Sequence, residues 1–200
     1  ELGDIDVMRV LTSATLRMTE GEILADRVRG QVDIDESTYM DITQRKTAEL
    51  FAAACALPAL FQPATLHLTE RLLDFGRSVG LSFQLVDDLL DFTAARSDLG
   101  KPVMADLLEG RVTLPIILLL RRADQRTHDR IASVVSSGTF EAISEDEILQ
   151  MVRTSGVLEE VRGRAQAHAA EAADRAQAFP PGPERDALIR ASHMLLERGV

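Results

Sequence analysis

The stretch "FQLVDDLLDF", Phe83 to Phe92, places three aspartates inside an otherwise apolar run. Burying a carboxylate is costly unless it is paired with a positive group or binds a cation. On a helix, Asp87 lies four residues before Asp91, and Asp88 lies three before it, so both pairs project to one side. Gln84 lies one turn earlier and borders the same patch. The stretch therefore predicts a helix that carries a dense cluster of negative charge.

A hard cation is one way to neutralise such a cluster. Carboxylates this close raise one another's pKa unless a positive charge lies among them. Oxygen ligands without His or Cys suit Mg²⁺, which also keeps waters and binds substrate phosphates, and they do not suit zinc. The alternative is a solvated acidic face on a helix whose other side is core. The flanking sequence "LSFQLV" leaves little polar surface for that alternative.

The remainder of the chain has the pattern of an all-α protein. Helical periodicity appears almost throughout, and alternating strand patterns bounded by turns are missing. We expect one all-α domain over residues 1–200. Several of its helices are too apolar for a surface, so some of them should be central. The expected helices are Ile5–Arg27, Ser37–Ala56, Ala64–Thr93, one starting at Thr113, one capped by Ser144 with Glu147 in a capping box, Val157–Phe179 and Pro183–Arg198.

The composition of the chain limits the class of protein and the kinds of partner that it can have. The chain has 200 residues, 46% of them hydrophobic, and a formal net charge of −10. The chain therefore has enough apolar residues to form a hydrophobic core. Nucleic-acid binding is disfavoured, because it needs clustered Lys and Arg. The single cysteine, Cys55, forms no intrachain disulfide, as in a reducing compartment. The apolar run Thr113–Leu120 is far shorter than the roughly 18 residues of a membrane span. We expect a cytoplasmic protein without a transmembrane segment.

Two further patches carry groups that bind phosphate. The stretch "RKTAELF", Arg45–Phe51, offers the ammonium of Lys46 and the hydroxyl of Thr47. The stretch "LGKPVMADLLEGRVTLP", Leu99–Pro115, places Lys101 at a glycine turn. Each signal alone is weak, because surface lysines are usually just solvated.

Taken together, these motifs resemble the second aspartate-rich region of the trans-isoprenyl (polyprenyl) diphosphate synthases. "EGE", Glu20–Glu22, also has the order and spacing of that family, and the resemblance covers nearly the whole chain. It implies an isoprenoid-synthase-like helical bundle around a central cavity. It also implies an enzyme of isoprenoid biosynthesis, a homodimer, that joins isopentenyl diphosphate head to tail to an allylic diphosphate with Mg²⁺ as cofactor.

The resemblance assigns metal binding and catalysis to particular residues. It implies that Asp87 and Asp88 hold Mg²⁺, with Asp91 completing the cluster directly or through water. It implies that Lys46, Lys101 and Asp87 are catalytic, since they act on the charge that grows on the leaving diphosphate.

The same resemblance implies a set of contacts to the substrate diphosphate. Arg111 stands where the family usually has lysine, and a guanidinium binds phosphate with a different geometry. Ala25 stands where many relatives have glutamine. The diphosphate-binding residues implied are Lys46, Thr47, Gln84, Lys101 and Arg111.

The chain also departs from the family pattern. The first aspartate-rich motif and the basic residues that grip isopentenyl diphosphate are not in these 200 residues. We therefore expect the chain to be the C-terminal part of a synthase, without its N-terminal helices. One alternative is a non-catalytic or partial subunit of a heteromeric synthase. Another is a terpene cyclase, but the Asn/Ser/Glu metal motif typical of those enzymes does not occur here.

Overall fold

The computed structural model describes residues 5–61, 63–93 and 103–197, and within these ranges it is helical without a β-strand. The all-α prediction is therefore confirmed. The α-helices are α1 (Ile5–Val28), α2 (Glu36–Thr43), α3 (Glu49–Ala56), α4 (Thr69–Thr93), α6 (Ala105–Leu108), α7 (Leu114–Leu120), α8 (Gln125–Ser137), α9 (Glu145–Thr154), α10 (Val157–Gln177) and α11 (Pro183–Glu197).

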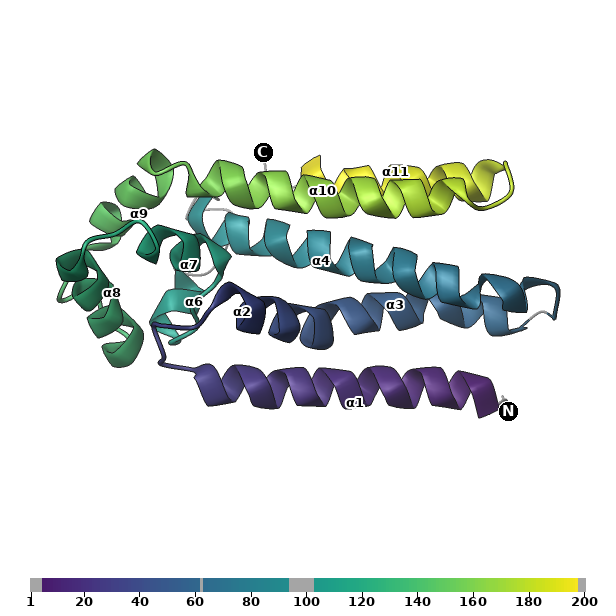
Figure 1. The fold of residues 1–200 in the computed structure, drawn as a ribbon, viewed down its shortest axis with the longest axis horizontal. Coiled ribbons are helices and arrows are strands. Elements are labelled where there is room, and N and C mark those ends of the chain that lie inside the picture. The colour runs from purple at the N-terminus through teal and green to yellow at the C-terminus, as the bar shows by residue number, and fades with distance from the viewer. Residues whose placement is uncertain (1–4, 62, 94–102, 198–200) are drawn as a thin grey trace.

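The long helices are stacked in layers around α4 (Figure 1). Helix α4 packs against α3 on one side and against α10 on the other, and α11 contacts both α4 and α10. Helix α1 forms the outer layer beside α2 and α3, while the short helices α6 to α9 gather at one end. The aspartate-bearing helix is thus the central element of the bundle.

The most apolar segment of the chain is buried. Leu114 through Leu119 of α7 are all buried. On α4, Leu85, Leu89 and Phe92 are buried in the same cluster, which also includes Tyr39 of α2. These α4 positions recur at helical spacing, so the face that they form points into the core. The aspartates lie between these apolar positions.

The predicted helix Ser37–Ala56 is present but is not uniform. Between α2 and α3 the backbone forms a π-helical turn, η1 (Gln44–Ala48), which contains Lys46 and Thr47. Such turns are rare and often mark functional sites. The predicted helix Ala64–Thr93 begins with a 3₁₀ segment, η3 (Pro63–Leu68), and continues as α4.

Helix ends follow the expected capping chemistry. The side chain of Ser144 accepts a hydrogen bond from the Glu147 N–H at 3.3 Å, which confirms the predicted cap of α9. Helix α8 was not predicted as a separate element. Asp124 caps its start, and Gly138 with a φ of 70° ends it.

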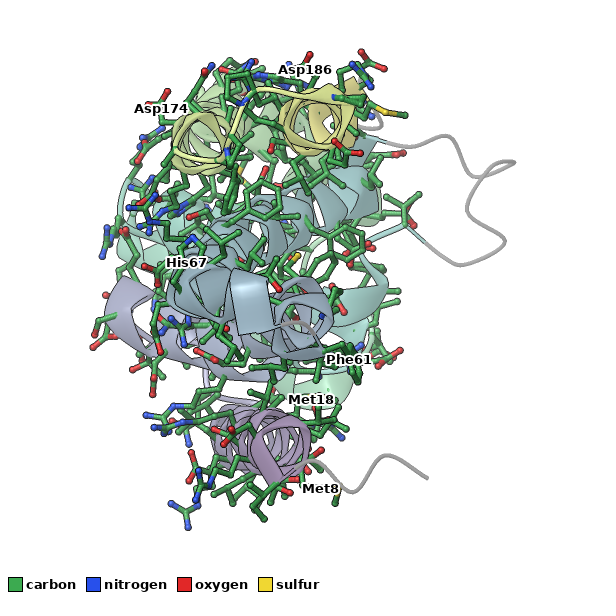
Figure 2. The ribbon with its side chains drawn as sticks, turned by 90° about the vertical axis from the view of Figure 1, so that its right-hand side faces the viewer. Met8, Met18, Phe61, His67, Asp174 and Asp186 are labelled. Carbon is green, nitrogen blue, oxygen red and sulfur yellow. The ribbon has the colours of Figure 1, made fainter. Side chains whose placement is uncertain are left out.

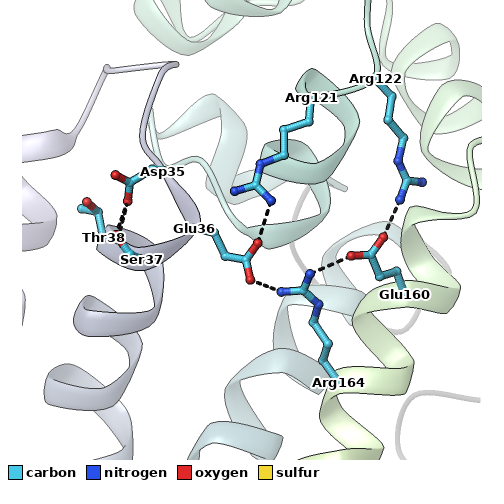
Figure 3. A network of polar contacts seen from close by, with 8 residues as sticks. All are labelled: Asp35, Glu36, Ser37, Thr38, Arg121, Arg122, Glu160 and Arg164. Carbon is cyan, nitrogen blue, oxygen red and sulfur yellow. Dashed lines mark hydrogen bonds and ion pairs between the residues drawn. The ribbon is translucent and has the colours of Figure 1, made fainter.

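An ion-pair network ties α2 to the opposite side of the bundle (Figure 3). Glu36, in the first turn of α2, pairs with Arg121 at 2.7 Å and with Arg164 of α10. Arg164 also pairs with Glu160 at 2.7 Å, and Glu160 pairs with Arg122. The hydrogen bond from Arg164 holds the pKa of Glu36 below its usual value, although burial opposes it. The start of α2 is therefore fixed against α7 and α10.

Helix α1 presents large apolar side chains to solvent. The end-on view in Figure 2 places Met8 at the outer edge of the molecule. The large hydrophobic side chains exposed on α1 are Ile5, Met8, Leu11, Leu16 and Ile23. A contiguous exposed apolar surface typically marks a contact with another element or chain.

Close helix crossings depend on glycines at two interfaces. A Cβ on Gly80 of α4 would lie 2.6 Å from the Ala48 Cα, and one on Gly76 would lie 2.5 Å from the Phe51 carbonyl oxygen. On α1, a Cβ on Gly21 would lie 2.7 Å from the Lys46 backbone nitrogen. Both crossings meet η1 or α3, so these glycines set where Lys46 and its neighbours lie.

We therefore expect Gly80→Ala to lower the free energy of unfolding by about 1–3 kcal/mol, because the added methyl group overlaps backbone that cannot move aside. Gly163→Ala is the matched control, since a Cβ at that α10 position has nothing within 4 Å. It should raise stability by up to about 1 kcal/mol through helix propensity alone. Urea denaturation of both variants checks this, and equal effects at the two positions would contradict the crossing argument.

Candidate active site

The three aspartates of α4 lie in three different environments. Asp88 is 1% exposed, Asp91 is half-buried and Asp87 is exposed. Successive helical residues point about 100° apart, so Asp87 and Asp88 cannot face the same way. The helix directs Asp87 toward an open pocket and Asp88 into the protein.

Asp88 is buried with a hydrogen bond to each carboxylate oxygen. The Tyr39 hydroxyl donates to Oδ2 at 2.6 Å, and the Gln84 amide donates to Oδ1 at 2.9 Å. Hydrogen bonds to a charged acceptor are shorter and stronger than neutral ones. These two hydrogen bonds replace hydrogen bonds that an exposed carboxylate would make with water.

A chain of hydrogen bonds connects this carboxylate with η1. The Thr47 hydroxyl donates to the Gln84 carbonyl oxygen Oε1 at 2.9 Å. That bond turns the Gln84 amide nitrogen toward the carboxylates, where it contacts Asp88 and, at 3.5 Å, Asp87. Two predicted diphosphate contacts, Thr47 and Gln84, are therefore joined to the predicted metal ligands.

Asp91 faces the start of α6. Its Oδ1 accepts a hydrogen bond from the Ala105 N–H at 3.1 Å, and its backbone carbonyl accepts one from Met104. Met104 adopts a left-handed φ of 55°, which is uncommon for a residue with a side chain and brings the α6 N–H groups toward α4. The second carboxylate oxygen, Oδ2, is buried and has no hydrogen-bond partner among the described residues.

A pocket of about 350 Å³ brings most of the predicted site residues together. It lies between the end of α1, α2 with η1, α4 and the segment that leads into α7. Asp91 is not in its lining, and Lys101 lies outside the described residues. The predicted residues in the lining are Lys46, Thr47, Gln84, Asp87, Asp88 and Arg111.

The two predicted cations in this pocket are already paired. Lys46 Nζ lies 2.7 Å from a carboxylate oxygen of Glu22 on α1. Arg111 binds Asp106 at 2.8 Å and Glu109 at 2.5 Å. A bound anion would therefore have to compete with carboxylates for these cations.

Two residues that complete the pocket belong to no motif that predicted a role for them. Asp106 adds a carboxylate beside Arg111, and Tyr39 bonds Asp88. Tyr39 lies seven residues before Lys46, a spacing that places both on one face of a helix. That spacing is the sequence signal that could have drawn attention to it, but its partner Asp88 is 49 residues away.

Burial raises the pKa values of two of the aspartates. Burial raises the pKa of Asp88 to about 7, although hydrogen bonds from Tyr39 and Gln84 oppose the change. Burial also raises the pKa of Asp91 to about 6, and the charge of Asp106 adds to it.

The oxygen donors near Asp87 suit Mg²⁺, which shares its ligands between protein, water and substrate. In the part of the chain that the structure describes, they do not form a site in which the protein alone supplies every ligand. Within the described residues, no three His, Cys, Asp or Glu side chains converge as a complete ligand group. Magnesium usually takes one or two carboxylates and completes its shell with water and substrate phosphates. The exposed Asp87 and the unpartnered Oδ2 of Asp91 are oxygen donors of that kind. The residues therefore fit a divalent cation shared with a substrate.

The raised pKa of Asp88 predicts how stability changes with pH. The unfolded carboxyl loses its proton near pH 3.9, but the folded one keeps it to about pH 7. The folded state therefore binds more protons between these values, so the free energy of unfolding should fall as pH rises through this window. Asp88→Asn cannot ionise there, and the fall should be smaller.

Urea denaturation without divalent cations, at about pH 5 and about pH 8, measures this difference. The Asn amide oxygen can still accept the Tyr39 hydrogen bond, so the variant should retain its packing. Equal pH dependence in both proteins would contradict the assignment of the shift to Asp88. Asp91 contributes in the same direction up to about pH 6 and remains in both.

Comparison with known proteins shows the family to which the chain belongs. The polyprenyl synthetase family matches residues 1–152. Octaprenyl diphosphate synthase of Escherichia coli (strain K12) is 34% identical over 197 residues, 98% of this chain and 61% of the relative. Heptaprenyl diphosphate synthase component 2 of Geobacillus stearothermophilus is 42% identical over 134 residues, 67% of this chain and 41% of the relative.

A solved structure also matches. The polyprenyl synthase of Caulobacter crescentus CB15, complexed with calcium and isoprenyl diphosphate, superposes with a TM-score of 0.86 at 28% identity. The match covers 98% of this chain and 60% of that one. The chain spans about three fifths of the length of the relatives it matches most fully. By sequence family and by fold, this chain belongs to the polyprenyl synthetases.

Proposed function

We propose that the protein is a Mg²⁺-dependent prenyltransferase that condenses isopentenyl diphosphate with an allylic diphosphate to make a polyprenyl diphosphate. One observation carries the proposal: a single pocket joins the Asp87 and Asp88 carboxylates of α4 to Lys46, Thr47, Gln84 and Arg111. Carboxylates alone would repel a diphosphate, and cations alone would leave the carboxylates uncompensated. The mixture suits a diphosphate bound together with a divalent cation.

The aspartates would hold the cation. Asp87 is the exposed one and lines the pocket, so it is the direct ligand in this proposal, with Asp88 and Asp91 completing the cluster. When bound, Mg²⁺ supplies positive charge that stabilises the leaving diphosphate. The Caulobacter relative, crystallised with calcium and isoprenyl diphosphate, supports a site of this chemistry in the family.

The remaining polar residues would bind the allylic diphosphate. Lys46 would exchange its Glu22 partner for a phosphate oxygen, and Arg111 would share its guanidinium between Asp106 and the substrate. Thr47, Gln84 and, from outside the described residues, Lys101 complete the set. As the carbon–oxygen bond to the diphosphate breaks, these donors would stabilise its growing charge. Lys46 and Lys101 would act catalytically in this way, and Asp87 would do so by holding the cation.

The apolar part of the pocket would protect the allylic carbocation that forms. The isopentenyl double bond attacks this cation, which forms the new carbon–carbon bond. The resulting carbocation then loses a proton. Water must be kept from the cation in the meantime. The aliphatic side chains in the pocket lining are Val28, Ile34, Ile42 and Val112.

A partial or non-catalytic subunit of a heteromeric synthase is the second candidate. It is favoured by the similarity to a relative named as component 2 of a heptaprenyl synthase. We propose a homodimer instead, and the exposed apolar side chains of α1 offer a surface for it. If the complete purified protein transfers prenyl groups without a second gene product, the heteromeric alternative fails.

Location belongs to the same proposal. We propose that the protein acts in the cytoplasm. The part of the chain that the structure describes contains no helix long and apolar enough to cross a membrane.

Asp87→Ala in the complete protein should lower the turnover number by about 10²–10³-fold, the size seen when one charge-stabilising group is lost. Incorporation of labelled isopentenyl diphosphate at saturating allylic substrate measures it. Glu145→Ala, a first-turn carboxylate of α9 outside the pocket lining, is the control. Unchanged turnover in Asp87→Ala would overturn the proposed site.

Lys46→Ala should raise the KM for the allylic diphosphate by about tenfold or more, since one charge-assisted contact to phosphate is removed. Arg130→Ala removes the same charge from α8, where Arg130 pairs with Glu147 away from the pocket lining. Steady-state kinetics of both variants distinguish substrate binding from a general loss of positive charge. Equal KM changes in the two would refute the contact.

A further inference from the structure

Tyr39 is buried, and its hydroxyl points at the carboxylate of Asp88. The residue is 6% exposed, and its hydroxyl lies 2.6 Å from Asp88 Oδ2. It is the single tyrosine of the 200 residues. A phenylalanine would fill the same space in the core, so packing alone does not explain the hydroxyl.

The scaffold holds this hydroxyl in place from several directions. Asp35 caps α2 by accepting a hydrogen bond from the Thr38 N–H at 2.7 Å. Glu36, in the next position, is tied to α7 and α10 by its two arginine partners, as Figure 3 shows. One turn later, Tyr39 projects from this anchored helix across to α4. Its position is thus set by contacts outside the pocket.

The two hydrogen bonds to Asp88 complement one another. Gln84 binds Oδ1 from the same helix, one turn away, and therefore moves together with Asp88. The Tyr39 hydroxyl donates to Oδ2 from a different helix, α2, and so fixes the position of this second oxygen relative to α2. Only the pair of bonds defines the orientation of the carboxylate plane relative to the rest of the pocket.

We propose that Tyr39 is a positioning residue, which holds the Asp88 carboxylate in the orientation that the divalent-cation site requires. The inference rests on the proposed function, because it takes the α4 carboxylates to be the site of the cation. Tyr39 itself need not touch cation or substrate. Its contribution is to keep a buried negative charge at one fixed place beside Asp87.

The test is Tyr39→Phe in the complete protein, with Mn²⁺ as the probe. Electron paramagnetic resonance measures free Mn²⁺, so binding is read without turnover. We expect the Mn²⁺ dissociation constant to rise about tenfold, the effect of losing one hydrogen bond to a charged group. In the assay, the half-saturating Mg²⁺ concentration should rise similarly, and kcat at saturating Mg²⁺ should approach that of the unmodified protein.

Ser82→Ala is the matched control for the loss of a buried hydroxyl from this core. Ser82 is fully buried on α4 and donates to the Ala165 carbonyl of α10 at 3.0 Å, away from the carboxylates. It should lower thermal stability while leaving the Mn²⁺ dissociation constant unchanged. A merely structural role for Tyr39 would give both variants the same pattern, namely fewer active molecules with an unchanged Mg²⁺ midpoint.

Two results would overturn the inference, and they differ in their reach. If Asp87→Asn weakens Mn²⁺ binding but Tyr39→Phe does not, the positioning role is wrong and the proposed function survives. If neither substitution changes Mn²⁺ binding, the cation site on α4 is wrong and the inference falls with it. Weaker binding in both Asp87→Asn and Tyr39→Phe, but not in Ser82→Ala, supports the role.

Discussion

A carboxylate removed from water at the centre of a helical bundle constrains the elements around it. Asp88 needs two donors, and they come from Gln84 on its own helix and Tyr39 on α2. Helix α2 must therefore lie within hydrogen-bond reach of α4, and the π-helical turn η1 must approach α4 closely enough for Thr47 to orient Gln84. The glycine contacts of α4 and the ion pairs of α2 serve this one arrangement. Leaving such a buried acceptor unpaired would cost about 1–3 kcal/mol.

The cations of the pocket are paired with carboxylates, and two of its neighbouring aspartates are wholly or partly buried. Lys46 is paired with Glu22, and Arg111 with Asp106, whereas burial raises the pKa of Asp88 and Asp91. Paired cations and buried carboxylates thus lie side by side. In the proposed function, a diphosphate that carries its own divalent cation would meet both kinds of group at once. Either component alone would meet one set of like charges, which favours binding of the two together.

The sequence predicted the long helices and their approximate ends, because apolar periodicity and caps such as Ser144 are local signals, but it missed α8. It could not give the π-helical turn at Lys46, since this turn depends on how α1 and α4 pack against it. The family motif indicated Asp87, Gln84 and Lys46 as site residues. The sequence did not indicate Tyr39 as a site residue, because its hydrogen-bond partner lies 49 residues away and it belongs to no motif.

The three carboxylates of the aspartate-rich motif therefore have different neighbours, although they lie on one helix. Rotation along α4 gives Asp87 to the pocket, Asp88 to Tyr39 and Gln84, and Asp91 to the N–H of Ala105. Adjacent carboxylates on a helix cannot form a symmetric pair of ligands, because their side chains diverge by about 100°. One of them must enter the core if the other is to meet solvent. The motif then requires a protein that can bury a negative charge, and the tyrosine on α2 helps to meet that requirement.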